Sequence, residues 1–300
     1  MLRGETEVPA ATAKKLAKAF SKNMETFALD RVLKKSEHKP GLRMSNIGHP
    51  CIRKTWLSVK GPDLVEGYEK PGLLEPRAYS SFNFGDITEE YILLLAEAAG
   101  HKVEGRQDLM ELEGVQGHRD AVIDGVLVDV KSASPFGFTK FVDGTLKDDD
   151  AFGYIGQIQT YLAAAQDDPL VTDKDRCAFL AFDKAKGTIH LDIHHKVDFD
   201  VAEVTKRIKA KMDSDELPDR AFEEVDDGYW KKHADGSREF IPNGNKKLCM
   251  NCSYCEERYN CWPYVEKWVR GRNIEYYTKI VKPFKGLHLE TNGVPVEEEG

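Results

Sequence analysis

An Asp-Gly pair at residues 124–125 constrains the fold more than any other feature of the sequence. It separates two short apolar runs, which is the strongest short-range signal for a β-hairpin with a two-residue turn. Such a turn pairs Ile123 with Val126 and joins residues 117–131 into one hairpin. One face of the hairpin is then apolar, with Ala121, Ile123, Val126, Val128 and Val130. The chain is therefore expected to contain a sheet built around this hairpin.

The other face of the hairpin carries charged groups. In the same register Asp120 lies directly across from Asp129, and Lys131 shares their face because side chains alternate along a strand. Carboxylates so opposed are about 5 Å apart at Cβ and repel each other. A sequence that has both is expected to neutralise them with a cation, and carboxylate oxygens suit Mg²⁺ or Mn²⁺. The alternative is an exposed hairpin with scattered charges.

The remaining pattern predicts an α/β protein. The expected elements are a helix over 82–99, strands at 102–113, 117–123 and 126–132, a helix over 151–166, strands at 177–183 and 187–194, and a helix over 198–213. This order indicates a central mixed β-sheet flanked by helices. Residues 214–247 are polar and are expected to form a loop or insertion, followed by a helix over 263–279 and an acidic tail. We divide the chain into an N-terminal helical region (1–80), a core (81–213) and a C-terminal region (214–300), which together form one integrated domain.

Composition argues against a membrane protein. Charged residues make up 31% of the chain and hydrophobic residues 41%, as in ordinary globular proteins. No run approaches the roughly 18 apolar residues that a membrane span needs. The first residues lack the apolar segment of a secretory signal, so a cytoplasmic location is expected. The net charge of −8 argues against nonspecific coating of nucleic acid, but it is compatible with a local basic groove beside a carboxylate site.

The cysteines indicate a second candidate site. Four of the six lie close together, at Cys249, Cys252, Cys255 and Cys261. This spacing is typical of metal ligands, and a disulfide framework is not expected in a cytosolic chain of this size. Four thiolates suit structural zinc or a [4Fe–4S] cluster equally well by count. Cys177 lies in an apolar strand and is expected to be an inert buried thiol.

The hairpin and the helix that follows it resemble a known signature. Asp120 with Asp129-Val130-Lys131 resembles the D…(D/E)-x-K motif of the PD-(D/E)XK nucleases, with Arg119 where that motif often has proline. Gln157 and Tyr161 share a helix face and resemble the Q-x-x-x-Y motif of RecB-like nucleases. The resemblance implies a restriction-endonuclease-like core.

A segment upstream of the hairpin resembles a third motif of these nucleases. Residues 85–89, Gly-Asp-Ile-Thr-Glu, are similar to G-x-x-x-(H/E), which implies Glu89 as a further metal ligand. Glu89 shares a helix face with Ile92 and Leu93, so its carboxylate needs a partner if it is buried. The neighbouring Glu90 is the alternative ligand. The acidic version of the motif resembles the lambda-exonuclease-like branch, whereas many RecB-like members have His.

The cysteine spacing also resembles a family pattern. Cys252-x2-Cys255-x5-Cys261 is similar to the C-terminal part of the cluster motif in AddB-type and CRISPR-associated RecB-like nucleases, and the segment 45–56 around Cys51 is similar to their upstream part. The resemblance implies a [4Fe–4S] cluster held by Cys51, Cys252, Cys255 and Cys261, which staples the N- and C-terminal segments together. Zinc is the alternative to iron–sulfur. A local zinc site that uses Cys249 in place of Cys51 is the alternative ligand set.

Taken together, the resemblance implies a Mg²⁺- or Mn²⁺-dependent deoxyribonuclease, an exonuclease on single-stranded DNA ends. Glu89, Asp120, Asp129 and the Val130 carbonyl would bind metal, Lys131 would assist the attacking water, and Gln157 and Tyr161 would orient the strand. By analogy the setting is DNA recombination, repair or phage DNA processing, with a possible recombination partner protein. A phage-encoded protein of this kind would act in the host cytoplasm. The alternative is a non-catalytic, zinc-stabilised nucleic-acid-binding or assembly subunit with a vestigial nuclease site.

Overall fold

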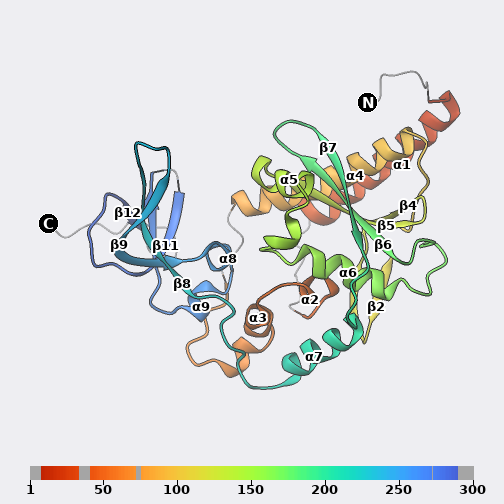
Figure 1. The fold of residues 1–300 in the computed structure, drawn as a ribbon. Helices are drawn as coiled ribbons and strands as arrows, with labels where there is room; N and C mark the ends of the chain where they lie inside the picture. Colours follow the sequence, from red (N-terminus) through yellow and green to blue (C-terminus); the bar gives the residue numbers. More distant parts are fainter. Residues whose placement is uncertain (1–7, 34–40, 72–75, 272, 290–300) are drawn as a thin grey trace. The chain divides into compact units, whose positions relative to one another are not determined.

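The computed structural model describes residues 8–33, 41–71, 76–271 and 273–289 (Figure 1). These residues divide into two compact units. The first takes its residues from Met1–His49 and Gly72–Asp213, and the second takes its residues from Pro50–Pro71 and Ser214–Gly300. This grouping differs from the division predicted at 80 and 213, because residues 50–71 belong with the C-terminal segment. In the described ranges, no helix is long and apolar enough to cross a membrane.

A five-stranded mixed sheet forms the centre of the first unit. In sheet order its strands are β1 (Val103–Glu104), β4 (Ala121–Ile123), β5 (Val126–Ala133), β6 (Arg176–Asp183) and β7 (Ile189–His195). β5 and β6 run parallel, and the other neighbours are antiparallel. A separate hairpin consists of β2 (Leu109–Leu112) and β3 (Val115–His118). The predicted mixed sheet is confirmed.

The Asp-Gly turn joins β4 to β5 as predicted. Asp124 and Gly125 have φ angles of 51° and 83°, and two successive positive values are the mark of a type I′ turn. Ile123 pairs with Val126, and the register continues through Ala121 and Val128. The hairpin register, on which the position of the carboxylates depends, is therefore confirmed.

Helices cover the sheet and connect its strands. They are α1 (Ala10–Phe27), α2 (Met44–Ile47), α4 (Pro76–Ala98), α5 (Pro135–Val142), α6 (Tyr154–Ala164) and α7 (Val201–Asp213), with a π-helical turn at Ala28–Leu33 and a 3-10 turn at Leu146–Asp148. The segment with α5 and α6 supplies the crossover that the parallel β5–β6 pair requires. α6 packs on the face that carries Val122, Leu127 and Phe179, none more than 1% exposed. The alternate residues Ala121 and Val128 are also buried, so both faces are covered.

The second unit contains an antiparallel sheet of five strands. In sheet order these are β12 (Leu287–Leu289), β10 (Glu266–Arg270), β11 (Asn273–Lys279), β9 (Arg238–Leu248) and β8 (Glu224–Lys232). The helices of this unit are α3 (Ile52–Leu64), α8 (Met250–Ser253) and α9 (Arg258–Cys261). A small core forms around Leu248, Val265 and Tyr276.

Two sequence-based predictions for the C-terminal region are wrong. The helix expected over 263–279 is the β10–β11 hairpin, in which Gly271 has a φ of 63° and Arg270 pairs with Asn273. The polar stretch 214–247, expected to be a loop or insertion, is not a loop, because it contains β8 and most of β9. Polar residues predominate in these strands, and Tyr229 and Trp230 of β8 are adjacent and both exposed, which hides the usual alternation; Asp235-Gly236 marks the turn between the strands. The predicted acidic tail lies outside the described residues.

Candidate active site

The β4–β5 hairpin brings two carboxylates together. Asp129 lies in β5 and is only 5% exposed. Asp120 immediately precedes β4, and its Oδ2 accepts a hydrogen bond of 2.7 Å from the backbone N–H of Val130. Burial raises the pKa of Asp120, and the negative charges of Asp129 and Glu89 raise it further. The two aspartates therefore repel each other across the hairpin, as their predicted register implies.

Lys131 is the cation closest to this pair. Its Nζ lies 2.6 Å from Oδ2 of Asp129, but that oxygen accepts no hydrogen bond of normal geometry. Burial disfavours the charged ammonium, yet the carboxylates of Asp129 and Asp120 outweigh it and raise the pKa of Lys131. The same Nζ lies 4.5 Å from the ring centre of Tyr154, a cation–π distance. One ammonium thus faces two carboxylates.

α6 supplies two polar side chains to the same site. Gln157 donates from Nε2 to Oδ1 of Asp129 at 3.2 Å, and its Oε1 lies 3.4 Å from Nζ of Lys131. Tyr161, one turn later, is 5% exposed. Burial raises the pKa of Tyr161, and the charges of Asp129 and Asp120 raise it further. Gln157 thus contacts Asp129 directly, and Tyr161, on the same helix face, is close enough to feel the charges of both aspartates.

Glu89 is the third acidic group of the site, and it differs from its neighbour Glu90. Oε1 of Glu89 accepts a 2.7 Å hydrogen bond from Nε2 of Gln107. Burial is the main reason that the pKa of Glu89 is raised to about 7. The hydrogen bond from Gln107 lowers this pKa, whereas the negative charges of Glu90 and Asp129 raise it. Glu90 instead pairs with Arg106 at 3.1 Å. The geometry therefore favours Glu89 over Glu90 as the residue that faces the aspartates.

Arg119, which stands where the family motif often has proline, has a structural role that the sequence did not show. It is 3% exposed, lies 2.6 Å from Asp108 and forms an ion pair with Asp168. Its Nε also donates to the carbonyl of Gly105 at 3.0 Å. These contacts hold the chain immediately before Asp120 against two other segments, the loop at residues 105–108 and the turn at Asp168. No local signal pointed to this, because Asp168 is 49 residues away in the sequence.

Gly48 positions the start of α6. A Cβ atom at Gly48 would lie 2.3 Å from the carbonyl oxygen of Gly153 and 2.4 Å from the backbone N of Gln157. Contacts this short are not tolerated, so the turn after α2 touches the first turn of α6 only because residue 48 lacks a side chain. This close approach sets the position of Gln157, and no local sequence pattern indicated it.

The carboxylate oxygens of the site are suited to a divalent cation, but the side chains do not surround a common metal position. In the described part of the chain, no group of three or more His, Cys, Asp or Glu side chains is placed to hold a metal ion as it stands. Burial is the main cause of the raised pKa values of Glu89 and Asp120, and neighbouring carboxylates raise them further, so a cation beside these oxygens would stabilise their ionised forms. Asp129 Oδ2 is buried without a hydrogen bond. Oxygen-only ligands of this kind suit Mg²⁺ or Mn²⁺.

The cysteines of the second candidate site all belong to the second unit. Burial is the main reason that the pKa of Cys252 is raised to about 12, and the neighbouring Cys249 and Cys255 raise it further. Burial likewise raises the pKa of Cys255 to about 12, and Cys51 raises it further against the opposing charge of Lys54. Cys51, from the N-terminal part of the chain, is thus close enough to Cys255 to interact with it. Cys177 is fully buried in β6, as expected.

Three buried N–H groups in the cysteine-bearing segments lack a hydrogen bond. They are Arg53 Nε, Arg258 Nε and Trp262 Nε1. Trp262 lies close enough to the thiol of Cys252 to lower its pKa, although the geometry falls short of a hydrogen bond. Buried donors without acceptors are costly and call for an explanation. Thiolates around a metal centre would provide acceptors, although the described thiols, like the carboxylates, do not form a group of three or more that could hold a metal ion as it stands.

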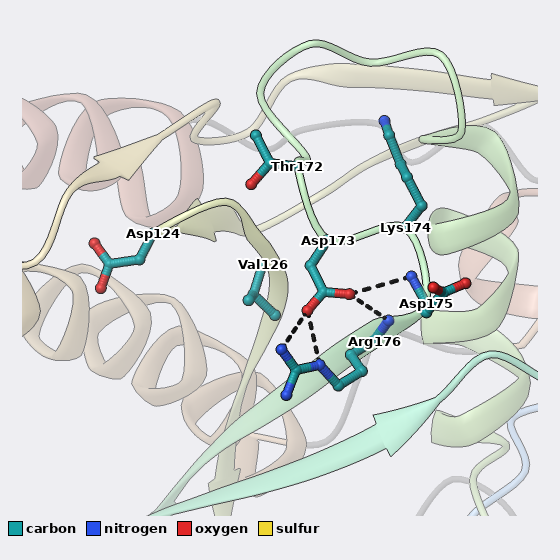
Figure 2. Close-up of a pocket in the computed structure, with 7 residues that line it drawn as sticks. All are labelled: Asp124, Val126, Thr172, Asp173, Lys174, Asp175 and Arg176. Atoms are coloured by element: carbon teal, nitrogen blue, oxygen red, sulfur yellow. Dashed lines mark hydrogen bonds and ion pairs between the residues drawn. The ribbon is translucent and has the colours of Figure 1, made fainter.

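A surface pocket of about 550 Å³ lies at the Asp-Gly turn (Figure 2). Its lining consists of Asp124, Val126, Thr172, Asp173, Lys174, Asp175 and Arg176. Arg176 is paired within the pocket, with Nη2 2.7 Å from Oδ2 of Asp173. None of the lining residues belongs to the carboxylate site, and we interpret the pocket as a solvated loop surface.

Comparisons with known proteins give only distant likenesses. No family model matches the sequence, and no curated protein matches it. A phage-related exonuclease from Haemophilus somnus 129PT is similar in structure, with 16% identity and a TM-score of 0.36 over 59% of this chain and 92% of the exonuclease. The protein SSO0001 is similar at 11% identity and a TM-score of 0.33, over 65% of this chain and 84% of its own. Likenesses this distant carry no conclusion about activity.

Proposed function

We propose that the chain is a Mg²⁺- or Mn²⁺-dependent deoxyribonuclease of the PD-(D/E)XK class. The observation that carries the proposal is the contact of Gln157 with both Asp129 and Lys131, beside the opposed Asp120. Residues from the β4–β5 hairpin, its preceding residue Asp120 and a helix thus meet at one point, and each has a chemical type suited to phosphodiester hydrolysis. An exposed hairpin with scattered charges would not bury Asp129 at 5% exposure.

Each residue has a role that follows from its chemistry. Glu89, Asp120, Asp129 and the Val130 carbonyl would hold the ion, which supplies Lewis acidity for the hydrolysis. Lys131, released from its contact with Asp129, would donate to the attacking water or to the phosphate oxygens. Gln157 and Tyr161 would position the DNA strand and keep the Lys131 ammonium in place.

The finer features of the proposal rest on the motif resemblance. They are exonuclease action on single-stranded DNA ends, a place in recombination, repair or phage DNA processing, and a possible partner protein in that process. A structural [4Fe–4S] cluster would be held by Cys51, Cys252, Cys255 and Cys261. The interaction of Cys51 with Cys255 and the three buried N–H donors support this cluster. Zinc, and a ligand set with Cys249, remain the alternatives.

Cleavage of end-labelled single- and double-stranded DNA tests the proposal. The wild-type protein should release labelled product with Mg²⁺ or Mn²⁺ and none with EDTA. Asp129→Ala should abolish cleavage. Because Asp129→Ala also creates a cavity, Asp129→Asn is the matched variant, since it removes the charge but keeps the volume and the acceptor for Gln157. Cleavage by Asp129→Asn at the wild-type rate would refute the assignment.

One observation favours a second candidate, the non-catalytic nucleic-acid-binding subunit. Lys131 and Gln157 already contact both oxygens of Asp129, so the site is neutralised in part without a metal. A vestigial site would remain in this state permanently. In a nuclease, divalent ions would displace Lys131 from Asp129 and release heat in calorimetry.

A further inference from the structure

The β8–β9 hairpin of the second unit displays an aromatic pair on one of its faces. Trp230 is 65% exposed and lies directly opposite Phe240. Their ring centres are 5.3 Å apart, with the planes inclined at 58°. A Cβ atom at Gly228 would lie 2.9 Å from the Phe240 ring, so this ring rests against the bare backbone of the neighbouring strand. Phe240 therefore supports an indole that remains open to solvent.

Two cations follow this aromatic pair on the same face. Lys232 lies directly opposite Arg238, and side chains two apart on a strand share a face. Like charges placed across a sheet destabilise it. Both side chains are exposed, and neither has an ion-pair partner among the described residues.

The acidic groups close to these cations are engaged elsewhere. Glu239 lies 3.1 Å from His233. Oδ1 of Asp235 accepts hydrogen bonds from the N–H and the hydroxyl of Ser237, at 2.9 and 2.7 Å. In a chain with a net charge of −8, this face keeps two positive charges that the protein itself does not neutralise. An anionic ligand is the simplest explanation.

We propose that this stacking face, composed of Trp230, Phe240, Lys232 and Arg238, binds single-stranded nucleic acid. An unpaired base would stack on Trp230, and the adjoining phosphates would contact Lys232 and Arg238. Aromatic platforms beside cations are the usual means of holding single strands. A duplex hides the faces of its bases, so the exposed indole selects unpaired strands. The inference concerns binding alone and does not depend on the proposed cleavage.

The opposite face of the same hairpin provides matched controls. Tyr229 is 59% exposed and, like Lys231, belongs to the residues that alternate with the stacking face. The full-length protein would be titrated in EDTA against a fluorescein-labelled oligodeoxythymidine, with fluorescence anisotropy as the readout. Trp230→Ala should weaken binding by about 5- to 100-fold, the range expected for one stacked base. Tyr229→Ala should leave the affinity close to wild type.

Salt dependence and tryptophan fluorescence identify the two components of the contact. The double variant Lys232→Ala, Arg238→Ala should lower the slope of log affinity against log salt by about 1.4, because each phosphate contact on a single strand contributes about 0.7. Lys231→Ala should not change the slope. Trp230→Phe should keep most of the affinity but lose the quenching of tryptophan fluorescence that the oligonucleotide causes in the wild type.

Several results would overturn the proposal. Equal losses in Trp230→Ala and Tyr229→Ala would mean that the stacking face has no special role. Equal competition by a DNA duplex would exclude selection for unpaired bases. Equal competition by polyglutamate would indicate an acidic protein partner instead. Thermal unfolding of each variant should match the wild type, because all the substituted side chains are exposed.

Discussion

Glu89 and Glu90 are neighbours in α4, yet their side chains meet different partners. Glu90 is an ion-pair partner of Arg106 and accepts a hydrogen bond from Asn23. Glu89 is instead linked to Gln107 and interacts with the charge of Asp129. A one-residue change of position thus separates a structural carboxylate from one that is available to a metal.

Glu89→Gln and Glu90→Gln form a matched pair of variants. Glu89→Gln should lower the rate of DNA cleavage by about 100-fold or more, as for other groups that stabilise charge in a transition state. Glu90→Gln loses only a partly exposed ion pair, worth about 1 kcal/mol or less, and should cleave nearly as well as the wild type. The rates would be measured at saturating Mn²⁺. The reverse order of activities would assign the ligand to Glu90.

The raised pKa of Glu89 predicts how the metal-free protein responds to pH. The folded protein holds a proton on Glu89 up to a pKa of about 7, whereas the ordinary value is 4.5. Between these values the folded state binds more protons, so its stability must fall as pH rises from about 4.5 to 7. We expect a loss of about 1–3 kcal/mol from this group. Thermal unfolding in EDTA should show it, and Glu89→Gln should flatten the curve.

At the scale of elements, the packing of α2 on α6 determines where Gln157 lies. Gly48→Ala would place a Cβ 2.3 Å from the backbone of Gly153, so α6 must shift or the turn must open. We expect a loss of about 2 kcal/mol or more, as for other overpacked sites, and reduced cleavage because Gln157 moves. Chemical denaturation and the DNA assay would measure both.

Gly137→Ala is the control for this change. A Cβ there would meet its nearest neighbour at 3.4 Å, an ordinary contact within α5. Alanine is favoured over glycine inside helices by about 0.5–1 kcal/mol, so this variant should be as stable as the wild type or more stable. Equal losses in Gly48→Ala and Gly137→Ala would show that the α2–α6 contact has no special role.

Local signals in the sequence were sufficient for some elements and not for others. The β4–β5 hairpin and the positions of Asp120 and Asp129 followed from the Asp-Gly turn, because a two-residue turn fixes register. β8 and β9 were missed because polar residues predominate in them and the apolar residues of β8 do not alternate with polar ones. The partners of Arg119 and Gly48 are brought together only by the fold, since Asp168 and Gly153 lie far away in the sequence. Sequence patterns therefore predicted the β4–β5 hairpin but not the contacts of Arg119 and Gly48 that position the residues around it.

At the scale of the whole molecule, the cysteines of one compact unit come from distant parts of the chain. Cys51 belongs to the same compact unit as Cys249, Cys252, Cys255 and Cys261. A metal centre that includes both Cys51 and the C-terminal cysteines would close a long loop. This loop contains residues 72–213 of the first unit. Such a closure should stabilise the folded state if the cluster binds only that state.

Metal content of cysteine variants distinguishes the two ligand sets. If Cys51 is a ligand, as proposed, Cys51→Ser should lose iron or zinc and Cys249→Ser should keep it. If Cys249 is the ligand instead, Cys249→Ser should lose the metal and Cys51→Ser should keep it. Cys177→Ser, a buried cysteine of the first unit, should keep the metal in either case. Elemental analysis after anaerobic purification would measure the content, and full retention in Cys51→Ser would contradict the proposed staple.

The proposed nuclease activity requires that the carboxylates of the first unit bind a divalent ion. Titration of the full-length protein with Mn²⁺ in a calorimeter, in parallel with Asp129→Asn, tests this most directly. The predicted result is one or two ions bound by the wild type at a site lost in Asp129→Asn, with binding that strengthens as pH rises through the pKa of Glu89, about 7. Equal heats from the two proteins, or no heat from either, would contradict a metal-dependent nuclease and favour the non-catalytic subunit.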